Sequence, residues 1–131
     1  MKYLFLIYSN PESWEHPIFQ RDPRFLALSQ DERDELLRDD EALYKEFTES
    51  GELVGGVALG DPMDSKTVRV RDGVPATTDG PYIETKEQLA GYFVFDCDSP
   101  ERAAEIAARF PDARFGAVEV RPIMDMSGQE M

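Results

Sequence analysis

The stretch TDGPYIETKEQLAGYFVFDC (Thr78–Cys97) joins a sharp turn to the most apolar strand candidate in the second half of the chain. Gly80 accepts a positive φ and Pro81 fixes φ, so the turn predicts an abrupt reversal of the backbone. In Leu89–Cys97 the odd-numbered and even-numbered side chains are both apolar. This pattern predicts a strand that is covered on both faces.

Other strands are predicted on either side of this stretch. Lys2–Tyr8 is also apolar on both faces, whereas Ala117–Arg121 alternates between valines and charged residues. Leu53–Leu59 reads as a further strand with a glycine pair inside it. Thr67–Arg71 and Val74–Thr78 flank an Asp-Gly pair, which is the signal of a β-hairpin with a two-residue turn.

Two helices are predicted from their ends and their periodicity. Ser29 and Glu32 form a capping box, and Gly51 ends a helix that reaches Ser50. The apolar stripe of this helix comprises Leu36, Leu37, Leu43, Tyr44 and Phe47. The opposite, solvated face is predicted to carry Asp34, Glu35, Arg38, Asp39, Asp40 and Glu41. A second helix begins at Ser99-Pro100 and is stopped by Pro111.

The order β-α-β, hairpin, β-α-β predicts an α+β fold of the ferredoxin-like, split-βαβ kind with an inserted β-hairpin. Both helices would cover one face of the sheet. Because two strands are apolar on both faces, a second copy of the chain is expected to cover the other face. A single domain is expected over residues 1–123, followed by a flexible C-terminal tail at residues 124–131.

Composition narrows the functional classes. The chain has 131 residues and a formal charge of −13, which argues against nucleic acid or an anionic membrane as a direct partner. No stretch approaches the roughly 20 apolar residues that a membrane span requires. The single Cys97 excludes an intrachain disulfide, so a cytoplasmic location is expected. One histidine and one cysteine cannot build a zinc site, and neither a metal nor a cofactor is expected.

The segment Thr78–Leu89 resembles the DGPFAETKE signature of the YCII-related proteins, with Tyr82 and Ile83 in place of Phe and Ala. Met1–Tyr8 and Gly116–Ile123 also fit, so the resemblance covers nearly the whole chain. It implies a dimeric α+β barrel of ferredoxin-like subunits with a pocket between sheet and loops. It also implies an association with sigma factors, and for the broader group a His–Asp pair.

Four residues are candidates for catalysis. Asp79 is either a turn residue that bonds nearby N–H groups or a general base whose pKa is set by burial and by Lys86. Glu84 and Lys86 are either part of a solvated charge cluster or a substrate anchor with a proton-transfer group. Thr85 and Gln88 could instead cap a short helical turn. His16 titrates near neutrality, but a lone histidine in a Pro-rich loop is more often a surface residue.

Four further residues are candidates for substrate binding: Tyr8, Tyr82, Glu87 and Arg121. The tyrosines could donate hydroxyl hydrogen bonds or simply pack. Arg121 lies on the polar side of the last strand, where it could bind a carboxylate or form a surface ion pair.

Two functional hypotheses follow. The first is a cofactor-independent enzyme that transfers a proton on a small acid or ring compound, isomerase-like or lyase-like, with its pocket at the Asp-Gly-Pro turn. The second is a non-catalytic module that binds a ligand or a protein, linked to regulation of transcription by sigma factors. Convergence of Asp79, Glu84, Lys86 and Arg121 on one pocket would favour the enzyme.

Overall fold

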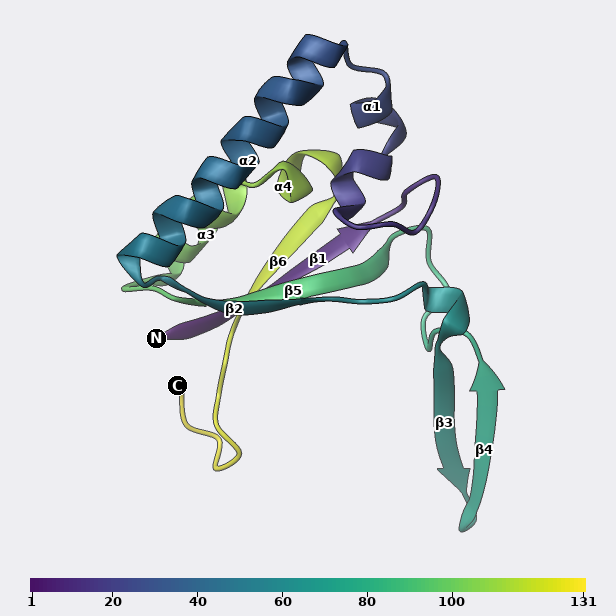
Figure 1. The fold of residues 1–131 in the computed structure, drawn as a ribbon. Helices are drawn as coiled ribbons and strands as arrows, with labels where there is room; N and C mark the ends of the chain where they lie inside the picture. Colours follow the sequence, from purple (N-terminus) through teal and green to yellow (C-terminus); the bar gives the residue numbers. More distant parts are fainter.

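A four-stranded antiparallel sheet organises the computed structural model, which describes residues 1–131 (Figure 1). Its strands are β1 (Lys2–Ser9), β2 (Leu53–Ala58), β5 (Gln88–Asp96) and β6 (Ala117–Pro122), in the order β2-β5-β1-β6. The two strands predicted to be apolar on both faces, β1 and β5, are therefore the central pair. The α+β class is confirmed.

The helices lie on one side of this sheet, except η2, which stands at the base of the projecting hairpin (Figure 1). The two long ones are α2 (Gln30–Ser50) and α3 (Pro100–Arg109). The shorter helices are η1 (Ile18–Arg21), α1 (Pro23–Leu26), η2 (Pro62–Asp64) and α4 (Pro111–Phe115). No helix among them combines the length and the apolar character needed to cross a bilayer.

Both predicted helix starts are confirmed by their hydrogen bonds. Ser29 Oγ accepts from the Glu32 backbone N–H as an N-cap does, while the Glu32 carboxylate accepts from the Ser29 hydroxyl at 3.0 Å and not from the Ser29 backbone N–H of a full capping box. Gly51 ends α2 with φ of 80°, a left-handed conformation that favours glycine. Ser99 Oγ accepts from the Arg102 N–H at the start of α3.

The core lies between the sheet and the helices. Tyr3, Phe5 and Ile7 of β1 are buried there, and the rings of Phe5 and Phe95 stack at 4.4 Å between centroids. The other face of β1 and β5 has no helix over it. Leu4, Leu6, Tyr8, Tyr92 and Val94 are only half-buried on that face.

The predicted hairpin is also confirmed. β3 (Lys66–Arg71) pairs only with β4 (Val74–Asp79), and both project from the body of the molecule (Figure 1). Asp72 and Gly73 at its tip have φ of 51° and 76°, as a type I′ turn requires. All six residues of β4 are exposed.

Two details of the prediction are wrong. Asp40, placed on the solvated face of α2, is only 8% exposed. It lies four residues after Leu36 and three before Leu43, so helical periodicity puts it on the apolar stripe. Pro111 does end a helix, but it also begins α4, which was not predicted.

The remaining loops are held by local hydrogen bonds. Thr85–Gln88 forms no helical turn; the Gln88 amide instead donates to the carbonyl oxygens of Ile83 and Thr85. Residues 124–131 are exposed and fold back, so that the Met131 N–H donates to the Ile123 carbonyl at 2.9 Å.

Replacement of Gly91 by alanine is expected to destabilise the fold. A Cβ at Gly91 would lie 2.5 Å from the Val57 carbonyl oxygen, so β2 and β5 would have to separate. Overpacking of this kind costs about 1–3 kcal/mol of unfolding free energy, measured by urea denaturation. Gly55→Ala on the same edge is the control, because a Cβ there meets nothing within 4 Å. Equal stability of both variants would contradict the close approach.

Candidate functional site

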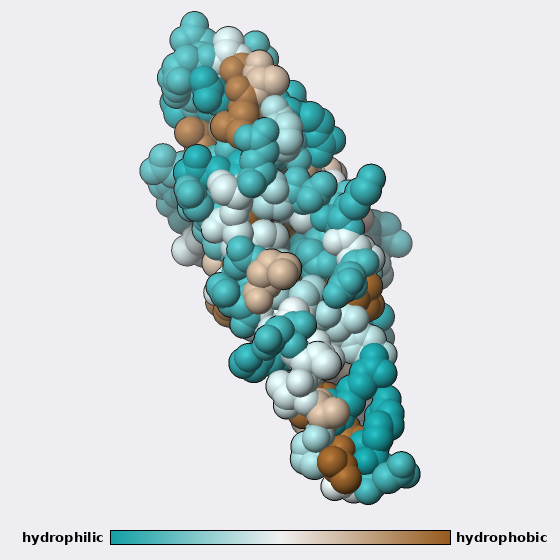
Figure 2. All heavy atoms as spheres, turned by 90° about the vertical axis from the view of Figure 1, so that its right-hand side faces the viewer, coloured by the Kyte–Doolittle hydropathy of each residue, from teal (hydrophilic) through white to brown (hydrophobic).

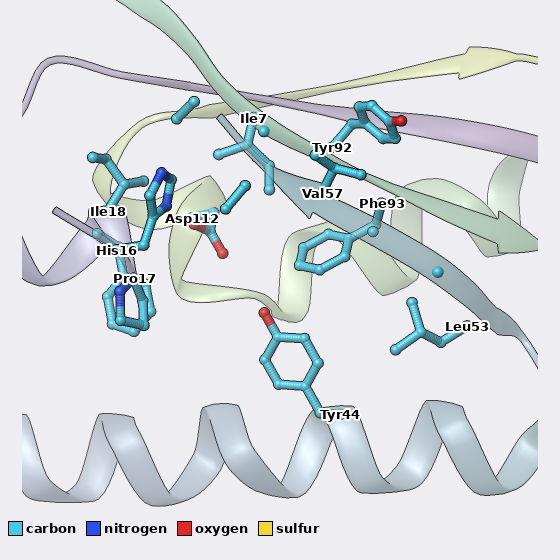
Figure 3. Close-up of a pocket in the computed structure, with 16 residues that line it drawn as sticks. Ile7, His16, Pro17, Ile18, Tyr44, Leu53, Val57, Tyr92, Phe93 and Asp112 are labelled. Carbon is cyan, nitrogen blue, oxygen red and sulfur yellow. The ribbon is translucent and has the colours of Figure 1, made fainter. Parts of the chain in front are cut away.

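A largely apolar cavity lies between α2 and the β2 edge of the sheet, and we call it the helix–sheet cavity (Figure 3). Its volume is about 400 Å³, enough for a small ring compound. Ile7, Ile18, Leu53 and Phe93 supply apolar wall. Its polar side chains are those of His16, Tyr44 and Asp112, whereas the Tyr92 side chain lies on the other face of the sheet.

Asp112 is the innermost charged group of the helix–sheet cavity. It stands in the first turn of α4, directly after Pro111, and is 8% exposed. Its carboxylate points into the cavity (Figure 3). Apart from its own backbone N–H, no group donates a hydrogen bond to it. A buried carboxylate without a partner is costly, so this arrangement is expected at a functional site more than in a structural core.

Asp40 and Tyr44 face Asp112 from α2, one helical turn apart. Asp40 Oδ1 is buried and has no hydrogen-bond partner. The Tyr44 hydroxyl points into the cavity toward Asp112 (Figure 3). Three oxygen-bearing side chains therefore meet where α2 and α4 approach each other.

Burial and mutual repulsion shift the proton affinities of these groups. Burial raises the pKa of Asp40 to about 7, with the charge of Asp112 adding to the effect. Burial also raises the pKa of Asp112 to about 6. The pKa of Tyr44 is raised by burial and then by both carboxylates, so its hydroxyl stays protonated. Near neutral pH the two carboxylates together hold a proton for part of the time.

His16 stands at the exposed mouth of the cavity. Its Nε2 lies 2.6 Å from the Leu59 carbonyl oxygen, which can only accept, so Nε2 carries a hydrogen. The Trp14 indole donates to the same oxygen at 2.9 Å. The ring is thereby held in one orientation, with Nδ1 left to exchange a proton with a ligand.

Three of the predicted catalytic residues line a different cavity, which we call the turn cavity. Its volume is about 470 Å³, and its lining includes Asp79, Glu84 and Lys86. The Asp79 side chain is 85% exposed and accepts a hydrogen bond from Lys66 Nζ at 2.7 Å. Asp79 is therefore exposed, and its ion-pair partner is Lys66 rather than Lys86. The buried Ser9 Oγ, also in this lining, has no hydrogen-bond partner.

The predicted binding residues are scattered. The Tyr82 ring lies 4.8 Å beneath the guanidinium of Arg69 on the hairpin. Tyr8 and Arg121 lie on the uncovered face of the sheet, and Arg121 Nε is 3.9 Å from a Glu119 carboxylate oxygen. Glu87 is exposed and lines neither cavity.

The sequence reasoning missed Asp40, Tyr44 and Asp112 as functional candidates. Asp40 could have been found, because it interrupts the apolar stripe of α2 in its own register. Tyr44 was assigned to that stripe, which is correct, but its hydroxyl was not considered. Asp112 carries no sequence signal beyond its place after Pro111.

The free energy of unfolding is expected to fall as pH rises from about 5 to 8. Unfolded aspartates titrate near 3.8, so in this window the folded state binds more protons at Asp40 and Asp112 than the unfolded state does. Each group contributes up to about 1.4 kcal/mol per pH unit. Asp40→Asn should flatten the profile measured by urea denaturation, and Asp39→Asn on the exposed face should not. Parallel profiles for the two variants would contradict the assignment.

Comparisons with known proteins agree with this fold without naming a reaction. Residues 1–127 match the model of the YCII-related domain. An uncharacterized protein of Rhizobium meliloti (strain 1021) is 34% identical over 99 residues, which cover 74% of this chain and 80% of that protein. The chain belongs to the YCII-related domain family.

Proposed function

We propose that the protein is a cofactor-independent enzyme that moves a proton on a small, largely apolar molecule bound in the helix–sheet cavity. One observation carries the proposal. A buried carboxylate, Asp112, faces an apolar cavity and accepts a hydrogen bond only from its own backbone N–H, and an oriented imidazole, His16, stands at the mouth. A general base and a second proton-transfer group on either side of a substrate suit an isomerase-like or lyase-like reaction.

The roles follow from the environment of each group. Asp112 accepts the proton from the substrate, and burial makes its conjugate acid weaker than that of an ordinary carboxylic acid, which strengthens the base. Asp40 stays protonated beside Asp112, so the two carboxyl groups together carry one negative charge. Tyr44 remains a hydroxyl donor for a developing negative charge, and His16 returns a proton from the solvent side.

The order β2-β5-β1-β6 supports the finer fold assignment, a ferredoxin-like split βαβ with the β3–β4 hairpin inserted. We extend the proposal to a homodimer in which two sheets pack face to face. Support comes from the half-buried apolar residues Leu4, Leu6, Tyr92 and Val94 on the uncovered face. Sheet packing of this kind would build the dimeric α+β barrel.

The turn cavity is the second candidate, because Asp79, Glu84 and Lys86 meet there beside the unpaired Ser9 hydroxyl. The non-catalytic alternative, a binding module linked to sigma-factor regulation, is favoured by one other observation. Val68, Val70 and Val74 are more than half exposed on the projecting hairpin, where Figure 2 shows hydrophobic side chains at the surface and a protein partner could cover them.

The enzyme proposal is tested by deuterium incorporation. Small ketones and phenols are incubated with the protein in D₂O, and exchange at carbon is followed by NMR. Asp112→Asn should slow exchange about 100-fold or more, the usual contribution of a general base, and His16→Ala should also slow it. Asp39→Asn should retain the activity.

The same assay separates the two cavities. Loss of exchange in Asp79→Asn, with Asp112→Asn active, would move the site to the turn cavity. Absence of exchange with every compound, together with capture of a protein through the hairpin valines, would favour the binding module.

The homodimer is tested by sedimentation equilibrium at micromolar concentration. The wild type is expected to sediment as a dimer, and Val94→Glu as a monomer, because a carboxylate would be buried between the sheets without a partner. Val68→Glu on the hairpin is the control and should leave the dimer intact. A monomeric wild type would contradict the packing of sheet on sheet.

A further inference from the structure

The helix–sheet cavity contains acidic groups but no cationic side chain of lysine or arginine. Among the side chains that line it, the ionisable ones are those of His16, Tyr44 and Asp112, with Asp40 just behind. The charges that perturb Asp40 and Tyr44 are those of the carboxylates alone, and no cation compensates them. The inner end of the cavity is therefore electronegative, which disfavours a carboxylate or phosphate ligand.

No side chain donates a hydrogen bond to the two carboxyl groups at the inner end. Asp40 Oδ1 has no partner, and the Asp112 carboxylate receives only its own backbone N–H. Asp112 is buried and aimed into the cavity (Figure 3). A ligand that satisfies this end must bring donors, and a positively charged donor forms the stronger, charge-assisted bond.

The aromatic walls favour the same kind of ligand. The rings of Tyr44 and Phe93 line the cavity together with Asp112 and lie edge to face, with 5.6 Å between their centroids. Aromatic faces attract organic cations, and more strongly where water is excluded. Ile7, Ile18 and Leu53 leave apolar wall for a hydrocarbon group.

We propose that the helix–sheet cavity binds a small organic amine in its ammonium form, with the nitrogen on one oxygen of Asp112 and the hydrocarbon part against Ile18 and Phe93, so that the other oxygen of Asp112 is left as the base. This substrate class rests on the proposed function, which assigns the cavity as the ligand site. An electronegative inner end disfavours small acids, one of the two substrate classes expected from the sequence. The ammonium assignment also gives Asp40 a role, since its proton leaves when a cation arrives beside the pair.

Three probes of similar size and different charge test the proposal by isothermal titration calorimetry at pH 7: 2-phenylethylamine, 2-phenylethanol and 3-phenylpropanoate. The amine should bind about ten- to a hundredfold more tightly than the alcohol, as expected for a charge-assisted hydrogen bond. The acid should bind more weakly than the alcohol. Titration in buffers of different ionisation enthalpy should show proton release on binding of the amine only.

Variants assign the preference to one side chain. Asp112→Asn should bind the amine and the alcohol alike, while Asp39→Asn on the exposed face of α2 should keep the wild-type preference. The probe comparison on the wild type stands even if Asp112→Asn fails to fold.

The outcomes separate this inference from the proposed function. NMR chemical-shift changes at Tyr44 and Phe93 show whether a probe binds in the cavity. If the alcohol or the acid binds there as tightly as the amine, the ammonium assignment is overturned and the cavity is left as the site. No shift at these residues with any probe would overturn both.

Discussion

The stacked rings of Phe5 and Phe95 join the two central strands, and further aromatic side chains of the core pack against Phe95. Phe47 of α2 and Phe110 at the end of α3 both lie against Phe95, at 5.7 and 6.0 Å between ring centroids. A separate aromatic group, Phe19, Phe25 and Phe115, packs η1, α1 and α4 together. Phe19 of the second group lines the helix–sheet cavity, as do Tyr44 and Phe93, which pack against the first group. The aromatic walls of the cavity therefore belong to packed clusters, in which side chains have little free volume.

This position explains how the chain tolerates two buried carboxylates. Asp40 and Asp112 each interrupt an apolar surface, which opposes folding unless they share a proton. The aromatic clusters on either side supply apolar burial that offsets this cost. Local rules of sequence and structure are broken at this one place, as is common where function is selected over stability.

Elements with strong local signals could be predicted from the sequence. The apolar runs of β1 and β5, the N-cap at Ser29 and the Asp72-Gly73 turn depend on neighbours in the chain, and all three are confirmed. The site could not be predicted in the same way. Asp40 was grouped with the charged residues beside it, although its burial is decided by α4, more than 60 residues away along the chain. The residues of the signature, in contrast, meet in an exposed turn, where Asp79 pairs with Lys66 across the hairpin.

The projecting hairpin has a consequence for how such a chain can vary. β3 and β4 make their ladder only with each other, and the left-handed turn at Asp72-Gly73 is the sole constraint at the tip. Insertion or deletion of matched residues in β3 and β4 changes the length of the hairpin by about 3.3 Å per residue pair, and the register of the four-stranded sheet stays the same. The hairpin and the cavity are therefore built independently within one chain, and what the hairpin contacts can diverge between relatives while the sheet and the helices that enclose the cavity are kept.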